Sequence, residues 1–319
     1  MTTYKEIYGT NVEVLSSDPT NPVEGQIWYN STSQTLKGYA LVAGSWATAG
    51  PLNTARFVLG GVGTQTAALA FGGGTTATVG ETESYNGTSW TELNNLNTAR
   101  QGLAGSGSNT AALAFGGFAP GNTAATENWT GTSWTSVTSL NTARNGLGGA
   151  GTNTAALAFA GDSPIGDTGD TESYNGSSWT ELNNLNSVRR DVGGCGATNT
   201  AALVFGGGQP IVGKTESWNG TSWTELNDLN AARYSVGGTG TNTAALAFGG
   251  DGTPNRASTE SWNGTSWINV NSLNIARSGI GGAGSNTAGL AFGGSVPPNV
   301  ASTEEWSGTP LQIVNITVS

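Results

Sequence analysis

A segment of 44 or 45 residues recurs six times along this 319-residue chain, and this repetition constrains the fold more than any other feature. The first block of each copy is Leu-Asn-Thr-Ala-Arg or a close variant, and it ends at six arginines: Arg56, Arg100, Arg144, Arg189, Arg233 and Arg277. A second block, close to Asn-Thr-Ala-Ala-Leu-Ala-Phe-Gly-Gly, follows each arginine, and a third contains a tryptophan in five copies. Repeats of this length stack on their neighbours to bury a shared core, which predicts one repeat architecture.

The third copy illustrates the strands that each repeat is expected to form. A glycine-dense stretch at 145–151 precedes an apolar strand at 155–159, and two further strands are expected at 171–174 and 178–182. The dipeptide Asn175-Gly176 predicts a type I′ hairpin turn, because both residues tolerate positive φ. Four antiparallel strands form one propeller blade, so the predicted fold class is an all-β, six-bladed propeller.

Composition agrees with an ordered all-β chain. Only 10% of the residues are charged and 51 are glycine, yet eleven Trp and eight Phe recur at regular intervals, which disordered segments lack. Small residues suit the first strand of each blade, since six such strands converge at the axis. Asn-Gly-Ser/Thr segments also match N-glycosylation acceptors, at Asn86, Asn175, Asn219 and Asn263, but the turn is the preferred interpretation.

Charge and cysteine content exclude several function classes. A net charge of −10 argues against nucleic acid as a partner, and the sequence contains neither an apolar run long enough to span a membrane nor a recognisable signal peptide. Cys195 has no partner for an internal disulfide, and the chain has no histidine. No metal, cofactor or catalytic residue is therefore expected, and the chain is predicted not to be an enzyme.

The two ends of the repeat array suggest how a ring closes. The sixth copy lacks a tryptophan strand after Glu304, whereas Trp46 precedes Arg56 by the same ten residues that separate Trp90 from Arg100. We therefore expect an N-terminal strand to complete the last blade. The predicted divisions are an N-terminal β module for attachment (1–43), the propeller (44–310), and a C-terminal strand or tail (311–319) that extends a blade edge or pairs with a partner.

Each repeat arginine comes with a repeat glutamate. A ring of arginines that binds an anion is one interpretation, but a structural ion pair in every blade is favoured because the two residue types recur together. The glutamates of this predicted ion-pair ring are Glu83, Glu127, Glu172, Glu216, Glu260 and Glu304.

The loops between the second and third strands are where the repeats differ. They emerge on the same face as the connections between blades, so this face is the candidate binding face, although free drift of surface loops would give the same pattern. Its candidate ligand-binding residues are Phe118, Asp162, Asp167, Asp170, Gln209, Asp251 and Arg256. The three aspartates at 162–170 leave Ca²⁺ as a minor alternative, without EF-hand spacing.

Two resemblances follow from the motifs. The double glycine after an apolar strand, as at 206–207, followed by an aromatic pair such as Trp218 and Trp223, resembles the kelch motif and implies a kelch-type propeller over most of the chain. The stretch from Asp18 to Tyr39, which begins Asp-Pro-Thr-Asn-Pro-Val-Glu-Gly-Gln-Ile-Trp-Tyr-Asn, resembles a short β-module common in tailed-bacteriophage virion proteins, often near tail fibres. This second resemblance implies a location on the particle surface.

The resulting functional hypothesis is a non-enzymatic bacteriophage virion structural protein, in a tail fibre, an appendage or a capsid decoration. Its expected partners are other virion proteins and a host-surface glycan or protein, with no insertion into a membrane; a homo-oligomer is left open. The alternative is a cellular kelch-type scaffold or adhesin that binds proteins or glycans. A paired-carboxylate glycosidase is a third, weaker alternative, since no two acids form an asymmetric pair.

Overall fold

The computed structural model describes residues 12–21, 25–40, 44–208, 210–252, 256–308 and 312–316, and every regular element in this part of the chain is a strand. The chain divides into two compact units: residues 1–44 with 308–319, and residues 45–307. The first unit holds one sheet in the order β1-β2-β3-β30, formed by β1 (Glu13–Leu15), β2 (Ile27–Asn30), β3 (Thr35–Ala40) and β30 (Gln312–Asn315).

The C-terminal strand β30 pairs antiparallel with β3, so it belongs to the first unit. The sequence predicted that this strand extends the edge of a blade or pairs with a partner, and it assigned residues 311–319 and residues 1–43 to different divisions of the chain. In the structure its partner is a strand of its own chain, and the paired residues, such as Lys37 and Asn315, come from distant parts of the sequence. Strands β1 and β2 pair in parallel, whereas β2 and β3 are antiparallel.

The second unit contains six four-stranded antiparallel sheets, numbered here along the chain. Sheets 1 and 2 contain β5 (Gly60–Thr64), β6 (Ala67–Phe71), β7 (Thr82–Tyr85), β8 (Trp90–Leu93), β9 (Ala104–Gly107), β10 (Ala112–Phe115), β11 (Thr126–Trp129) and β12 (Trp134–Val137). Sheets 3 and 4 contain β13 (Gly148–Gly151), β14 (Ala156–Phe159), β17 (Thr171–Tyr174), β18 (Trp179–Leu182), β19 (Gly193–Thr198), β20 (Ala201–Phe205), β21 (Thr215–Trp218) and β22 (Trp223–Leu226). Sheets 5 and 6 contain β23 (Gly237–Gly240), β24 (Ala245–Phe248), β25 (Thr259–Trp262), β26 (Trp267–Val270), β27 (Gly281–Gly284), β28 (Ala288–Phe292), β29 (Thr303–Ser307) and β4 (Ser45–Ala49).

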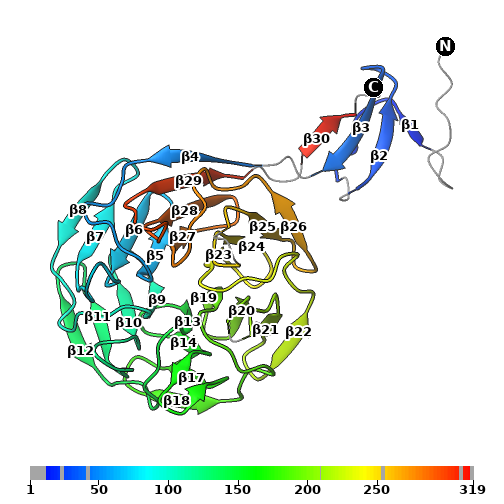
Figure 1. Ribbon diagram of the computed structural model, residues 1–319. Coiled ribbons are helices and arrows are strands. Elements are labelled where there is room, and N and C mark those ends of the chain that lie inside the picture. The colour runs from blue at the N-terminus through cyan, green and yellow to red at the C-terminus, as the bar shows by residue number, and fades with distance from the viewer. Residues whose placement is uncertain are drawn as a thin grey trace. The chain divides into compact units, whose positions relative to one another are not determined.

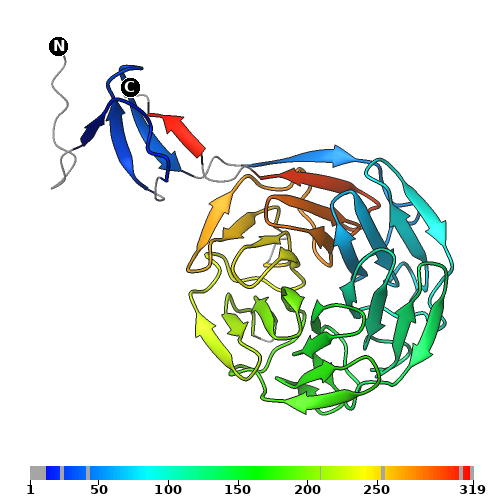
Figure 2. The same cartoon turned by 180° about the vertical axis from the view of Figure 1, so that it is seen from behind.

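These sheets give the second unit a propeller-like repeat fold, in agreement with the predicted all-β class. The first strand of every sheet lies innermost, and the inner strands contact one another in the order β5, β9, β13, β19, β23, β27 (Figures 1 and 2). Strand β27 in turn contacts β5. The outer strand of sheet 6 is β4, which pairs with β29 in a register that places Trp46 opposite Trp306.

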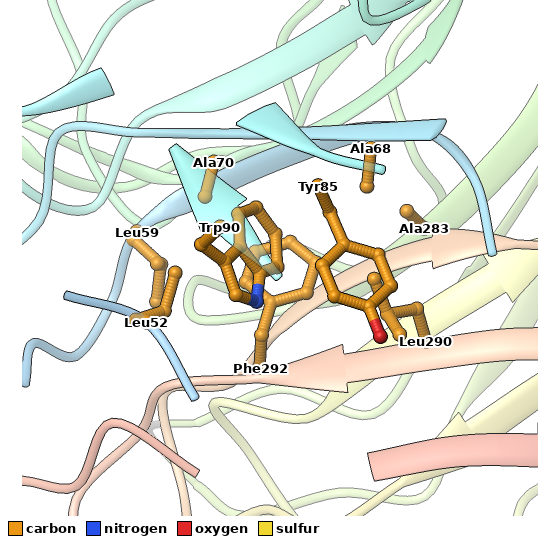
Figure 3. Close-up of a cluster of buried hydrophobic side chains, with 9 residues drawn as sticks. All are labelled: Leu52, Leu59, Ala68, Ala70, Tyr85, Trp90, Ala283, Leu290 and Phe292. Atoms are coloured by element: carbon orange, nitrogen blue, oxygen red, sulfur yellow. The ribbon is translucent and has the colours of Figure 1, made fainter. Parts of the chain in front are cut away.

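Neighbouring sheets are held together by the tryptophan of each outer strand. Trp90 of β8 packs against Phe292 of sheet 6, with ring centroids 4.9 Å apart, inside a cluster of buried aliphatic side chains (Figure 3). Its indole Nε1 donates to the Thr303 hydroxyl, 3.0 Å away. Trp46 makes the equivalent contacts to sheet 5, with Phe248 at 5.2 Å and Thr259 at 3.0 Å. The tryptophans of five outer strands therefore supply both apolar burial and a directional bond between sheets, whereas Trp179 of β18 packs against Phe115 with its indole Nε1 buried and unbonded.

The inner strands approach closely enough to require glycine. A Cβ atom on Gly149 of β13 would lie 2.7 Å from the Gly105 carbonyl oxygen of β9 and 2.9 Å from the Phe115 ring. Any larger residue would push two sheets apart at the centre, so the glycine content of this strand follows from its place near the axis.

The predicted type I′ turn at Asn175-Gly176 is wrong. Only Gly176 has positive φ, at 94°, whereas a type I′ turn requires positive φ at both residues. The strands β17 and β18 are joined by four residues, and the Asn175 side-chain oxygen accepts hydrogen bonds from the backbone N–H groups of Ser177 and Ser178. The asparagine is required as a side-chain acceptor rather than for a left-handed backbone.

Candidate functional site

Every repeat arginine of the second unit lies beside the repeat glutamate of its own sheet, and both side chains are almost completely buried. The nitrogen–oxygen distances range from 2.6 to 3.2 Å over the pairs Arg56–Glu83, Arg100–Glu127, Arg144–Glu172, Arg189–Glu216, Arg233–Glu260 and Arg277–Glu304. Burial lowers the pKa of each arginine, and the neighbouring glutamate opposes this effect. For Arg233 the lowered pKa is about 10.

The glutamate of each pair also holds the connection that enters its sheet. In sheet 3, Glu172 accepts hydrogen bonds from the backbone N–H and the side-chain amide of Asn141, at 2.7 and 2.9 Å, and from Arg144 at 2.8 Å. The asparagine of the Leu-Asn-Thr-Ala-Arg block is therefore a third member of this arrangement, which the sequence analysis missed. With no surface open to an external anion, the geometry of these pairs is that of a structural anchor.

A cycle of six backbone hydrogen bonds surrounds the centre at the face where the inner strands begin. The second residue after each repeat arginine donates its N–H to the carbonyl of the equivalent residue in a neighbouring sheet, at 2.7–2.9 Å. All six members have positive φ, between 45° and 63°: Val58, Gly102, Gly146, Asp191, Ser235 and Gly279. A β-branched residue such as Val58 is strained in this conformation, so the cycle is maintained there against a local cost.

A cavity lies at each end of the centre. At the end with the hydrogen-bond cycle its volume is about 90 Å³, and its lining includes Leu59, Asp191 and Val236. At the opposite end the volume is about 470 Å³, and the lining consists of Gly, Ser, Thr, Ala and Asn residues such as Ser108 and Thr241.

The two faces of the second unit differ in chemistry. The variable face carries the loops between second and third strands and the connections between sheets; the uniform face carries the turns between first and second and between third and fourth strands. The most exposed large apolar side chains described in this unit all lie on the variable face, at Phe118 (39% exposed), Ile165 (99%), Val188 (64%), Ile211 (42%) and Ile275 (38%). The described turns of the uniform face contain neither charged nor large apolar residues.

The predicted ligand residues are distributed around the variable face. Phe118 pairs with Gln101 of the connection into its sheet, and the Asp251 carboxylate accepts a hydrogen bond from the Tyr234 hydroxyl at 2.9 Å. The Arg256 side chain donates to the Gly252 carbonyl oxygen at 3.3 Å. Gln209 lies outside the described residues.

The three aspartates proposed as a cation-binding group do not form one. Asp162 and Asp167 lie 3.2 and 3.6 Å from the Arg190 guanidinium, so the positive charge of this arginine side chain already occupies the space between the two carboxylates. Asp170 lies apart and accepts a hydrogen bond from the Asn184 amide. Among the residues that the structure describes, no group of three or more His, Cys, Asp or Glu has a geometry suited to a metal ion.

Asp191 is the carboxylate that the sequence analysis missed in this cluster. It lies 3.8 Å from Arg190, and burial raises its pKa, with Arg190 acting in the opposite direction. Burial likewise raises the pKa of Asp167. Arg190, the partner of these carboxylates, was missed as well, although a signal was available for it: the residue after each repeat arginine differs in every repeat, as Phe57, Gln101, Asn145, Arg190, Tyr234 and Ser278.

The sequence was compared with protein-family models and with curated proteins. No protein-family model matches the sequence, and no similar sequence is found among curated proteins. The described part of the chain contains no helix of the length and apolarity needed to cross a membrane.

Proposed function

We propose that the second unit is a closed, six-bladed, kelch-like propeller whose ring is completed by β4. The cycle of backbone hydrogen bonds supports this proposal, because each inner strand has one neighbour on either side. The position of Trp46 supports it as well, since its contacts to Phe248 and Thr259 repeat those of Trp90 to Phe292 and Thr303. Closure of this kind removes exposed sheet edges and joins the ends of the array.

We propose that the protein is a non-enzymatic binding module that uses the variable face. The observation that carries this proposal is the distribution of exposed apolar side chains, which gather on one face while the uniform face is polar and uncharged. Exposed apolar residues with neighbouring charges are typical of protein interaction sites. The buried arginines and glutamates are engaged with one another, which favours a structural role over catalysis.

The proposed setting is the surface of a bacteriophage virion, in a tail fibre, an appendage or a capsid decoration. It depends on the N-terminal motif, whose residues meet in the first unit. The Asp18 carboxylate accepts hydrogen bonds from the Trp28 indole at 3.0 Å, the Asn30 amide at 2.7 Å and the Lys37 ammonium at 2.8 Å. A compact unit separate from the six sheets, with its own sheet of β1, β2, β3 and β30, suits an attachment module and leaves the variable face for a host-surface glycan or protein, or for another virion protein.

The location is tested by mass spectrometry of purified particles, combined with labelling of the protein in electron micrographs. We expect the chain among the structural proteins, at a tail or capsid position. Absence from washed particles would refute the virion proposal and favour the cellular scaffold or adhesin. Binding is tested separately, by measuring attachment of the purified chain to host cells and to particles that lack it.

Variants assign the binding to a face. Replacing Phe118 or Ile211 with serine alters the variable face at half-exposed positions, whereas Thr110→Asn alters an exposed turn of the uniform face. If the proposal holds, changes on the variable face weaken binding and Thr110→Asn does not. The reverse pattern would assign binding to the uniform face.

A further inference from the structure

One loop of the variable face forms a small hairpin. Strands β15 (Asp162–Ser163) and β16 (Gly166–Asp167) pair antiparallel, with Pro164 and Ile165 at the tip. The Ser163 hydroxyl is buried in the turn, where it donates to the Gly166 carbonyl oxygen at 2.9 Å. Ile165 is 99% exposed, so a preorganised turn holds an isoleucine out into solvent. A rigid tip loses little conformational entropy when it binds.

Two more exposed aliphatic side chains lie on neighbouring segments. Val188 belongs to the connection between sheets 3 and 4, next to Arg189, whose N–H bonds to the Thr168 carbonyl oxygen in the loop of sheet 3. On its other side, Lys214 of the sheet 4 loop donates to the Ser187 hydroxyl at 2.9 Å. That loop also carries Ile211. We call Ile165, Val188 and Ile211 the aliphatic patch.

The charge beside the aliphatic patch is negative. Arg190 lies 3.2 to 3.8 Å from the carboxylates of Asp162, Asp167 and Asp191, and Lys214 lies 2.9 Å from Glu225, so four acidic groups face two basic groups. The whole chain carries a net charge of −10. A basic partner would therefore be attracted to this region, whereas a second copy would bring like charges together.

The side chains of the patch also distinguish between classes of partner. All three are aliphatic, and none offers an aromatic face on which a sugar ring can stack. The acidic neighbours oppose phosphate groups, whether of nucleic acid or of anionic lipid. A protein pocket lined by apolar residues and rimmed by Lys or Arg satisfies both features.

We propose that the aliphatic patch is a docking site for a basic protein, with Ile165 inserted into an apolar pocket of that partner. This inference rests on the proposed binding role of the variable face and assigns it to the loops of sheets 3 and 4. Ile165 is the anchor, and the carboxylates around Arg190 orient the basic rim of the partner.

A random peptide library, displayed and selected on the intact chain, provides the test. We expect enriched peptides to combine apolar residues with flanking Lys or Arg, and to bind less tightly as salt rises. The variant Ile165→Asn should lower the affinity for synthetic copies of these peptides about tenfold or more, because it removes the aliphatic side chain that becomes buried in the complex. Because Ile165 is fully exposed in the free chain, the thermal unfolding curve of the Ile165→Asn variant should match that of the parent chain.

Ile275→Asn is the matched control, with the same replacement at another exposed isoleucine of the same face. It should leave the affinity within about twofold of the parent chain. If Ile275→Asn lowers the affinity for the peptides and Ile165→Asn does not, the proposed docking site is refuted, while a binding role for the variable face remains. Selection of no peptide above the Ile165→Asn background, or of peptides without basic residues, overturns the proposal.

Analytical ultracentrifugation of the chain alone tests whether a second copy of the chain covers the aliphatic patch. A dimer that forms with rising concentration and is abolished by Ile165→Asn would show that a second copy covers the patch. Failure of the intact chain to attach to cells or particles would instead refute the proposed function itself.

Discussion

The buried ion pairs provide the sharpest test of what holds each sheet to the connection that enters it. In sheet 2, the Arg100 guanidinium lies 2.6 Å from a Glu127 carboxylate oxygen, and it donates a second bond to the Ala114 carbonyl at 3.2 Å. Neither side chain of the pair is exposed by more than 1%. Glu127 also accepts hydrogen bonds from the backbone N–H groups of Asn97 and Thr98, at 2.7 and 3.3 Å.

The substitution Arg100→Leu leaves the Glu127 carboxylate buried without its countercharge. Removal of one partner from a buried pair costs about 3–5 kcal/mol, because the remaining charge has lost its solvation without compensation. The free energy of unfolding should fall by this amount, a large part of the about 5–15 kcal/mol that stabilises a typical domain. The equivalent change Arg277→Leu, in sheet 6, should have a similar cost, since the contacts repeat.

Urea unfolding followed by tryptophan fluorescence measures this loss, and eleven tryptophans make the signal strong. The double variant Arg100→Leu with Glu127→Leu removes both charges and leaves the Asn97 N–H without its acceptor, at a cost of about 1–3 kcal/mol. It should therefore be less destabilised than the sum of the two single variants.

Two results would refute this reasoning. A loss below about 1 kcal/mol for Arg100→Leu would mean that the pair contributes no more than an exposed salt bridge. Loss of ligand binding with an unchanged unfolding curve would instead assign the arginines to an anion-binding ring.

Three further predictions concern the hydrogen-bond cycle, ring closure and the first unit. Val58→Gly should raise the free energy of unfolding by about 1 kcal/mol, because a β-branched residue at a φ of 45° is strained, and Gly102→Val should lower it by about 1–2 kcal/mol in the same urea assay. Deleting residues 1–51 removes β4 and Trp46, so calorimetry should show a clearly lower Tm; an unchanged melting curve would contradict closure by β4. Hydrogen bonds from Lys37 and then Asn30 lower the pKa of Asp18 to about 2, below its ordinary value near 3.8. Its stabilisation of the first unit should be complete above about pH 4 and lost as the pH falls through 2, and hydrogen exchange of β2 should show that Asp18→Asn abolishes this dependence.

Much of the second unit could be predicted because its information is local and repeated. The spacing of Ala-Leu-Ala-Phe blocks and aromatic residues predicted four strands per repeat, and each pairs within one sheet of the structure. Turn chemistry was harder to predict, since Asn175 could supply either a left-handed backbone or a side-chain acceptor. Both uses have the same sequence signature, and only the φ angle distinguishes them.

The candidate site was predicted less completely. The sequence grouped Asp162, Asp167 and Asp170 by their proximity along the chain, yet the fold turns Asp170 away and brings Arg190 between the other two. Ile165 was not singled out, because a lone isoleucine in a loop gives no sign of its exposure. The left-handed residues of the hydrogen-bond cycle were missed for a similar reason, since Val58, Asp191 and Ser235 share no side-chain property.

The amino-acid sequence by itself therefore determined the repeat length, the strand content of each repeat and the presence of a paired arginine and glutamate. These features depend on periodicity and composition within about 45 residues. The spacing of Trp46 before Arg56 also predicted that an N-terminal strand completes the last sheet, where β4 pairs with β29. The tertiary structure alone decided that β30 joins β3 and which charges of the variable face meet. Such contacts join residues from different repeats or from opposite ends of the chain, and they form only when several sheets pack together and bury their shared surfaces.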